Sequence, residues 1–321
     1  MDAGREPIKP TPAPVLTSVR EVNSMTKLNL EGVYVPNVTP FDVKGDIQYE
    51  ALGELIEYWI GAGVSGIVAN ASTGESPYLN IEELAEVLGF VIDQVDGRAQ
   101  VIAGTGAMAT RETIELTRDA KNAGAEAALI TTPYFFRPAE EELYRHYAAV
   151  LSAIDLPVIL YNVPKFTGYS IAPKTIARIA EDYSGLAGVK DSSGSPGNMA
   201  EIIRLCGDRI ACLSGAADMF LPTLSLGGRG AILAIANVIP GTCVELHQAF
   251  GRGDIVMVGK RQRTVSHVNN VLVTSFPQVA AIKTTLNSMG YKAGVPRQPL
   301  LPLNEAQEKA SSEALKNTKL Y

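Results

Sequence analysis

Residues 158–190 read VILYNVPKFTGYSIAPKTIARIAEDYSGLAGVK and hold two short apolar runs with a longer segment of helical spacing between them. The runs at 158–161 and 186–190 have the length and the aliphatic content of buried strands. The apolar residues between them recur every three or four positions, as on one face of a helix. A strand, a helix and a second strand in this order form the repeating unit of a parallel sheet with helices outside it.

The same unit recurs along the chain from Gly32 onward, and we count eight copies of it. Strands are expected at residues 33–38, 66–69, 100–103, 127–131, 158–161, 186–190, 210–214 and 231–235. Their starts lie roughly 20 to 35 residues apart, which suits about 250 residues shared among eight repeats. We therefore predict an α/β protein with the fold of a (β/α)₈ TIM barrel.

The alternative architecture is a doubly wound open sheet. That fold prefers a glycine-rich phosphate loop after its first strand. Residues 35–40, Val-Pro-Asn-Val-Thr-Pro, are not such a loop. The barrel is therefore the favoured prediction.

Three regions are expected along the chain. Residues 1–28 are polar and rich in proline, which predicts a flexible N-terminal tail. The barrel is assigned to residues 29–240, and residues 241–321 are predicted to form a helical appendage packed on it. Helices are expected there at residues 243–250, 254–273, 278–289 and 305–315. Within the barrel, Asn80 to Glu83 resembles a capping box and Gly124 a helix C-cap.

Composition excludes several classes of function. Of 321 residues 46% are hydrophobic, and the formal net charge of -6 argues against binding to nucleic acid or to an anionic membrane surface. The apolar runs fall short of the ~20 residues that cross a bilayer. Three cysteines without CxxC spacing indicate neither a disulfide framework nor a zinc knuckle, so we expect a cytoplasmic, reducing compartment. A small molecule is the expected partner.

No cofactor or metal is expected from the motifs. His146, His247 and His267 fall in expected helices without metal-ligand spacing. The glycines of Gly104-Thr105-Gly106 lack the rest of a dinucleotide fingerprint, so neither NAD nor ATP is indicated.

Lys190 is the sharpest chemical signal, because it closes an otherwise apolar strand. Active sites of such barrels lie at the C-terminal ends of the strands. Strand alternation puts Leu186, Gly188 and Lys190 on one face, with Gly188 leaving room beside the amine. Burial lowers the pKa of an amine, and a neutral amine attacks ketones to form imines. The alternative is a lysine whose ammonium simply reaches solvent.

Other strand ends add groups that suit the same chemistry. Tyr161 ends the preceding strand and could move protons, or it could be an ordinary core aromatic. Ser72, Thr73 and the amides around Gly74 could bind a carboxylate, or form a plain turn. Gly215 would let the backbone approach a ligand closely, although glycine is common near turns.

Taken together, these motifs resemble those of the dihydrodipicolinate synthase and N-acetylneuraminate lyase superfamily of pyruvate-dependent class I aldolases. The likeness runs from about Gly32 to the end of the chain. Three elements carry it: residues 71–75 (ASTGE, for the family's G-x-x-G-E with its first glycine replaced), residues 161–164 (YNVP, for Y-N-x-P) and residues 188–191 (GVKD, for G-x-K-[DE]).

The resemblance implies roles for individual residues. Lys190 is expected to form the Schiff base with pyruvate without a cofactor, with Tyr161 as the proton-transfer phenol and Ser72 and Thr73 on the carboxylate. It also implies a homotetramer built from tight dimers, in which residues 132–136, with Tyr134, reach toward the partner's active site.

Two departures from the synthase pattern bear on the substrate. Phe166 stands where the synthases carry an arginine that grips the carboxylate of aspartate semialdehyde, so a bidentate clamp is lost, and Lys165 does not replace it. The loop tyrosine pair of the synthases is here Tyr134 followed by Phe135. Residues 213–217 and 234–238, with Gly215 and Ile235 as expected substrate contacts, are similar to the 4-hydroxy-2-oxoglutarate and 2-keto-3-deoxy-acid aldolase branch.

The resemblance thus favours a lyase that cleaves or forms a 4-hydroxy-2-oxo acid or a 2-keto-3-deoxy sugar acid. Its partners would be pyruvate, or another 2-oxo acid, and an aldehyde. Two alternatives stay open: 4-hydroxy-tetrahydrodipicolinate synthase despite Phe166, and an inactive homologue that only binds a 2-oxo acid.

Overall fold

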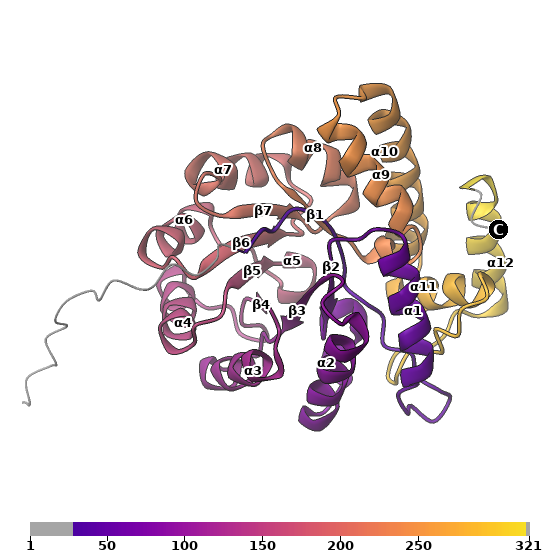
Figure 1. Cartoon of the computed structure of the whole chain (residues 1–321), viewed down its shortest axis with the longest axis horizontal. Coiled ribbons are helices and arrows are strands. Elements are labelled where there is room, and N and C mark those ends of the chain that lie inside the picture. The colour runs from indigo at the N-terminus through magenta and orange to yellow at the C-terminus, as the bar shows by residue number, and fades with distance from the viewer. Residues whose placement is uncertain (1–27, 319–321) are drawn as a thin grey trace, which may run out of the picture.

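Eight parallel strands close into a barrel in the order β1 to β8 in the computed structural model, which describes residues 28–318 (Figure 1). The strands are β1 (Gly32–Val35), β2 (Gly66–Ala69), β3 (Gln100–Gly104), β4 (Ala127–Thr131), β5 (Val158–Asn162), β6 (Leu186–Asp191), β7 (Ala211–Ser214) and β8 (Gly230–Ile232). The barrel closes where Val33 of β1 pairs with Ala231 of β8. The predicted (β/α)₈ barrel is confirmed.

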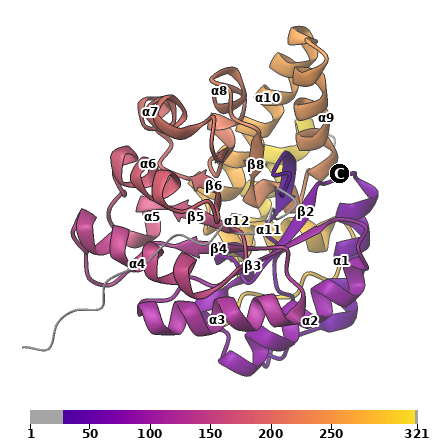
Figure 2. The same cartoon turned by 60° about the vertical axis from the view of Figure 1, so that its left-hand side comes forward.

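Helices surround the strands, most of them as an outer ring, as both views show (Figures 1 and 2). They are α1 (Tyr49–Gly61), α2 (Ile81–Val95), α3 (Thr110–Ala123), α4 (Glu140–Ala153), α5 (Pro164–Thr167), α6 (Pro173–Asp182), α7 (Pro196–Cys206), α8 (Phe220–Ser225), α9 (Pro240–Gly251), α10 (Ile255–Asn269), α11 (Gln278–Ser288) and α12 (Glu305–Leu315). No helix within residues 28–318 is long and apolar enough to cross a membrane.

Apolar side chains fill the barrel from inside and bind the helices to it from outside. Nearly every strand sends a side chain into one inner cluster, for example Tyr34, Ile102 and Ile159. Two outer clusters lie between strands and helices. Because both faces of each strand are covered, the strands are continuous apolar runs. The polar residues at their C-terminal ends are therefore the informative ones.

Asn237 makes the first and last strands shorter than predicted. We expected strands at 33–38 and 231–235, but β1 ends at Val35 and β8 at Ile232. The Asn237 amide donates to the carbonyls of Pro36 and Ala234, and its oxygen accepts from the Val38 backbone. These bonds replace ladder hydrogen bonds, and residues 234–237 turn into a short 3₁₀ segment instead.

A bulge in β6 corrects the predicted alternation around Lys190. Val158 pairs with Leu186, but the next residue, Ile159, pairs with Gly188. Because of the extra residue, the side chain at the start of the strand points to the opposite face of the sheet. Leu186 therefore packs in an outer cluster instead of sharing the inner face with Lys190. Gly188 also does not leave room for the amine, because a Cβ there would lie 3.0 Å from Leu30 and 2.9 Å from the Ala211 carbonyl oxygen.

The C-terminal helices follow the expected order with altered ends. Proline suits the first turn of a helix, and α9 starts at Pro240, earlier than the predicted 243. The helix predicted at 254–273 changes after Asn269 into a π-helical turn, Asn270–Ser275. Both the capping box of Asn80 and Glu83 and the left-handed C-cap at Gly124 are confirmed. Residues 1–27, which hold most of the expected tail, lie outside the described residues.

Candidate active site

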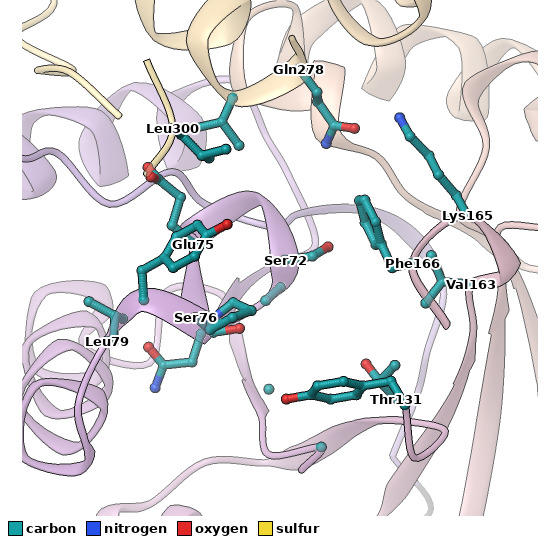
Figure 3. Close-up of a pocket in the computed structure, with 18 of the residues that line it drawn as sticks. Ser72, Glu75, Ser76, Leu79, Thr131, Val163, Lys165, Phe166, Gln278 and Leu300 are labelled. Carbon is teal, nitrogen blue, oxygen red and sulfur yellow. The ribbon is translucent and has the colours of Figure 1, made fainter. Parts of the chain in front are cut away.

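A cavity of about 1400 Å³ lies at the C-terminal ends of the strands. Its wall is built by the segments that follow β2, β4 and β5, together with the C-terminal part of the chain (Figure 3). The lining residues used below are Asn70, Ser72, Glu75, Glu112, Leu129, Thr131, Tyr134, Tyr161, Lys165, Phe166, Gln278 and Leu300. The position agrees with the rule that barrel active sites lie at this end of the strands.

Lys190 lies in the wall of the barrel next to this cavity, with 3% of its surface exposed. Its Nζ is 4.0 Å from the centre of the Tyr161 ring, and the two residues are partners in neighbouring strands. Burial lowers the pKa of the Lys190 amine, and the Tyr161 phenol partly opposes that shift. Within residues 28–318, no carboxylate forms an ion pair with this amine.

Tyr161 connects the amine to the cavity. Its ring lines the cavity floor together with Leu129 and Thr131, whereas Lys190 is not itself a lining residue. The structure therefore brings these two predicted residues together, with the amine at the edge of the open space. The Tyr161 phenol thus lies beside both the cavity and the amine, a position from which a phenol can transfer protons.

Polar residues next to Lys190 fix the end of β6. The Asp191 carboxylate is buried and accepts from the Asn162 amide at 2.6 Å and from the Ser193 hydroxyl at 2.6 Å. Asn162 also accepts from the Ile171 backbone through its own side-chain oxygen. These bonds join the ends of β5 and β6, so Tyr161 and Lys190 are held in register. Asn162 and Asp191 belong to two of the three motifs named above, but no role was predicted for either.

Gly215 lies directly against Lys190. A Cβ at this position would stand 3.1 Å from Lys190 Cε and 2.0 Å from Ser192 Oγ, so only glycine fits. The Ser192 hydroxyl is buried and has no hydrogen-bond partner in the described chain. It is a candidate substrate contact that was not predicted, because Ser192 directly follows the motif without any signal of its own.

The turn of residues 72–74 forms another part of the site. Ser72 is half-buried and lines the cavity, whereas Thr73 and Gly74 are buried behind it. The turn is a single 3₁₀ segment, and the Thr39 hydroxyl holds it by donating to the Gly74 carbonyl at 2.8 Å. A Cβ on Gly74 would lie 2.8 Å from the Asn37 carbonyl oxygen.

Phe166 and Lys165 face this turn from the other side of the cavity, and Gln278 enters from α11 (Figure 3). Phe166 is 52% exposed on the short helix α5. Among the lining residues Lys165 supplies the one free cation, and no arginine is present. The outer wall can therefore contact an apolar or hydroxylated group, but it offers no bidentate grip on a second carboxylate.

Tyr134 lines the cavity, and burial, followed by the charge of Glu112, raises the pKa of its phenol. The next residue, Phe135, points away into solvent with 84% of its surface exposed and a φ of 79°. Of these two loop residues, Tyr134 therefore belongs to this cavity and Phe135 does not.

Ile235 does not reach the cavity, contrary to expectation. It is 1% exposed and packs in the outer core among the C-terminal helices, because residues 234–237 turn away after the short β8. The described residues contain no cluster of three or more His, Cys, Asp and Glu side chains that could hold a metal ion. The site thus consists of an amine, a phenol, hydroxyls and backbone donors.

Comparison with known proteins agrees with this geometry. Residues 29–318 match the model of the dihydrodipicolinate synthetase family. The chain belongs to this family. Members use a pyruvate Schiff base on a lysine and no cofactor, so the protein is a carbon–carbon lyase of the class I aldolase type.

Individual relatives in this family cover nearly the whole chain. The 4-hydroxy-tetrahydrodipicolinate synthase of Geotalea daltonii is 38% identical over 290 residues, which is 90% of this chain and 99% of the relative. The dihydrodipicolinate synthase of Acinetobacter baumannii, solved with pyruvate, has a TM-score of 0.87 at 35% identity and covers 91% of this chain and 100% of its own. The E. coli K12 prophage protein YagE, also solved with pyruvate, has a TM-score of 0.86 at 32% identity, with 91% and 99% covered.

Proposed function

We propose that Lys190 is the imine-forming lysine of this pyruvate-dependent lyase. The observation that carries the proposal is a buried amine with a lowered pKa and no carboxylate partner in residues 28–318, beside a cavity floored by a phenol. The neutral amine attacks C2 of pyruvate, and the carbinolamine loses water to give a protonated imine. That imine is the electron sink for making or breaking the C3–C4 bond.

Tyr161 and the 72–74 turn complete the proposed mechanism. The Tyr161 phenol gives its proton to the carbinolamine hydroxyl that leaves as water, and the resulting phenolate takes the proton of the C4 hydroxyl as the C3–C4 bond breaks. In the synthetic direction the phenolate takes a proton from C3 of the imine to give the enamine, and the phenol so formed protonates the aldehyde oxygen as the bond forms. Ser72, Thr73 and the amides of the turn hold the pyruvate carboxylate, which places the ketone carbon at Lys190.

We infer that the second substrate is the aldehyde part of a 4-hydroxy-2-oxo acid or 2-keto-3-deoxy sugar acid. Phe166 supports this assignment, because it occupies the wall where a carboxylate-binding arginine would be needed for aspartate semialdehyde. An apolar ring accepts an uncharged, hydroxylated aldehyde without leaving a buried charge unpaired. A 2-keto-3-deoxy sugar acid therefore fits this wall better than 4-hydroxy-2-oxoglutarate, whose aldehyde part, glyoxylate, also carries a carboxylate.

A second candidate is 4-hydroxy-tetrahydrodipicolinate synthase. It is favoured by the names of relatives 36–38% identical over about nine tenths of this chain. Turnover assays separate the two candidates: pyruvate release from 4-hydroxy-2-oxoglutarate or 2-keto-3-deoxy sugar acids supports the aldolase. Condensation of pyruvate with aspartate semialdehyde at a comparable or higher kcat/KM would establish the synthase.

The imine itself is tested by intact-mass spectrometry after incubation with pyruvate and borohydride, followed by peptide mapping. A single stable adduct on Lys190 is expected, and none in Lys190→Ala. A folded protein that gives no adduct in excess pyruvate would instead be a homologue that only binds 2-oxo acids.

We further propose a homotetramer built from tight dimers. The exposed Phe135 and Phe136, at 84% and 79%, support it, because their two adjacent rings form an exposed apolar patch and such patches mark protein–protein interfaces. A monomeric variant of dihydrodipicolinate synthase is also among the related structures, so a monomer is the alternative. Light scattering of the wild type and of Phe135→Ser tests this assembly; a monomeric wild type would overturn it.

A further inference from the structure

Glu75 and Lys283 form an ion pair in the interior beside the active site. Each residue has 1% of its surface exposed, and Lys283 Nζ lies 2.6 Å from a carboxylate oxygen of Glu75. Glu75 directly follows the 72–74 turn, and Lys283 belongs to α11, more than 200 residues later. A buried pair of this kind needs further hydrogen bonds to offset the loss of hydration of its charges.

Those further bonds come from one C-terminal segment. The Arg297 backbone N–H donates to the second carboxylate oxygen of Glu75 at 2.8 Å, and Lys283 donates to the Val295 carbonyl at 2.8 Å. The Phe41 ring lies against both cations, 4.5 Å from Lys283 Nζ and 4.4 Å from the Arg297 guanidinium carbon. Each oxygen of the carboxylate thus accepts a hydrogen bond from the C-terminal part of the chain.

The backbone of Glu75 makes the pair relevant to the site. Its N–H donates to the Ser72 carbonyl at 3.2 Å, so Glu75 closes the turn that carries Ser72 and Thr73. Its φ of 61° is left-handed, a conformation that costs energy in a residue other than glycine and persists only where surrounding contacts hold it. The side-chain contacts with α11 and residues 295–297 are such contacts.

We propose that Glu75 and Lys283 are positioning residues, whose ion pair holds the donors of the 72–74 turn where the substrate carboxylate binds. The inference rests on the proposed carboxylate role of that turn. Lys283 of α11 thereby contributes to pyruvate binding although it does not line the cavity, and the Glu75 side chain reaches the side of the cavity where Leu300 lies (Figure 3).

The test is a set of variants: Glu75→Gln, Lys283→Met and the double variant. The double variant removes both charges and keeps similar shapes, so it is expected to fold even if a single variant does not. Glu57→Gln is the matched control, because Glu57 pairs with Arg98 at the same 2.6 Å but on the surface. The readout is the pyruvate concentration that gives half-maximal borohydride trapping on Lys190.

The double variant is expected to need at least about tenfold more pyruvate while reaching the wild-type adduct yield at saturation, as expected for the loss of one or two ordered hydrogen bonds to a charged group. Methyl pyruvate lacks the carboxylate, so its half-saturation should stay within about twofold of the wild type. A folded double variant with an unchanged pyruvate requirement would overturn the inference, and so would an equal loss for both ketones. If the wild type gave no adduct, the proposed function would fail first and this inference with it.

Discussion

Two buried lysines in this protein differ in what stands next to them. Lys190 and Lys283 are 3% and 1% exposed, and burial lowers the pKa of both amines, that of Lys283 to about 8. Lys283 has a carboxylate at 2.6 Å, whereas Lys190 has a tyrosine ring at 4.0 Å. The Glu75 carboxylate favours the charged form of Lys283, and the pair holds the structure together. No carboxylate favours the charged form of Lys190, so this amine is the one suited to act as a nucleophile.

The largest effect is expected from removing the unpaired amine. Lys190→Ala should lower kcat by roughly four orders of magnitude or more and abolish the pyruvate adduct, because the covalent route is lost. The fold should persist, since the mutation removes a buried amine that has no ion-pair partner. Steady-state assays and circular dichroism check both points, with Lys174→Ala on the exposed face of α6 as the control. Substantial remaining activity in Lys190→Ala would contradict the mechanism.

The second-largest effect is expected from removing the phenol hydroxyl beside Lys190. Tyr161→Phe should lower kcat about 10²- to 10⁴-fold, the usual contribution of a positioned proton donor. The ring stays in place, so pyruvate should still be trapped on Lys190, only more slowly. Tyr147→Phe is a control, because Tyr147 is also buried but its hydroxyl bonds the Ile130 carbonyl away from the cavity. Equal losses in the two variants would indicate a packing effect instead of proton transfer.

The paired lysine should affect stability more than chemistry. Lys283→Met leaves the Glu75 carboxylate buried without its cation, which typically costs about 3–5 kcal/mol. Glu57→Gln on the surface should cost about 1 kcal/mol or less. Urea unfolding of both variants measures the difference. The double variant Glu75→Gln with Lys283→Met should recover most of the stability. If Lys283→Met and Glu57→Gln lowered the free energy of unfolding by similar amounts, the contrast between the buried and the surface pair would be wrong.

A smaller effect is expected from filling the space next to Lys190. Gly215→Ala puts a methyl group 3.1 Å from Lys190 Cε and 2.0 Å from the Ser192 hydroxyl, so the hydroxyl must move and the Lys190 side chain must shift slightly. We expect roughly a tenfold loss of the trapping rate, equivalent to about 1.4 kcal/mol. Gly241→Ala is the control, because nothing lies within 4 Å of the added methyl group. Unchanged trapping in Gly215→Ala would mean that the amine has more freedom than the packing implies.

The sequence was sufficient to predict the barrel and to place Lys190 at the end of a barrel strand. Eight apolar runs with regular spacing specify the strands, and a lysine closing such a run is visible without a structure. Strand ends were harder, because Asn237 competes with the ladder through bonds that join residues about 200 positions apart. The bulge in β6 could not be predicted from the pattern of apolar residues. The role of Lys283 could not be predicted either, because only the folded chain brings it next to Glu75.

The smallest effect concerns how the two lysines respond to pH. An amine reacts when neutral, and a lowered pKa lets Lys190 reach that state at lower pH than an ordinary lysine with a pKa near 10.5. The initial rate of pyruvate trapping should therefore reach half its maximum well below pH 10.5. Peptide mapping after trapping at pH values below and above the pKa of Lys283, which is about 8, shows which of the two amines is labelled. Lys283 should stay unlabelled even above pH 8, although it is then mostly neutral, because its amine is enclosed by Glu75, Val295 and Phe41. Labelling of Lys283 would contradict this expectation. It would show that a lowered pKa is enough to make a lysine reactive, and that access to the cavity is not required.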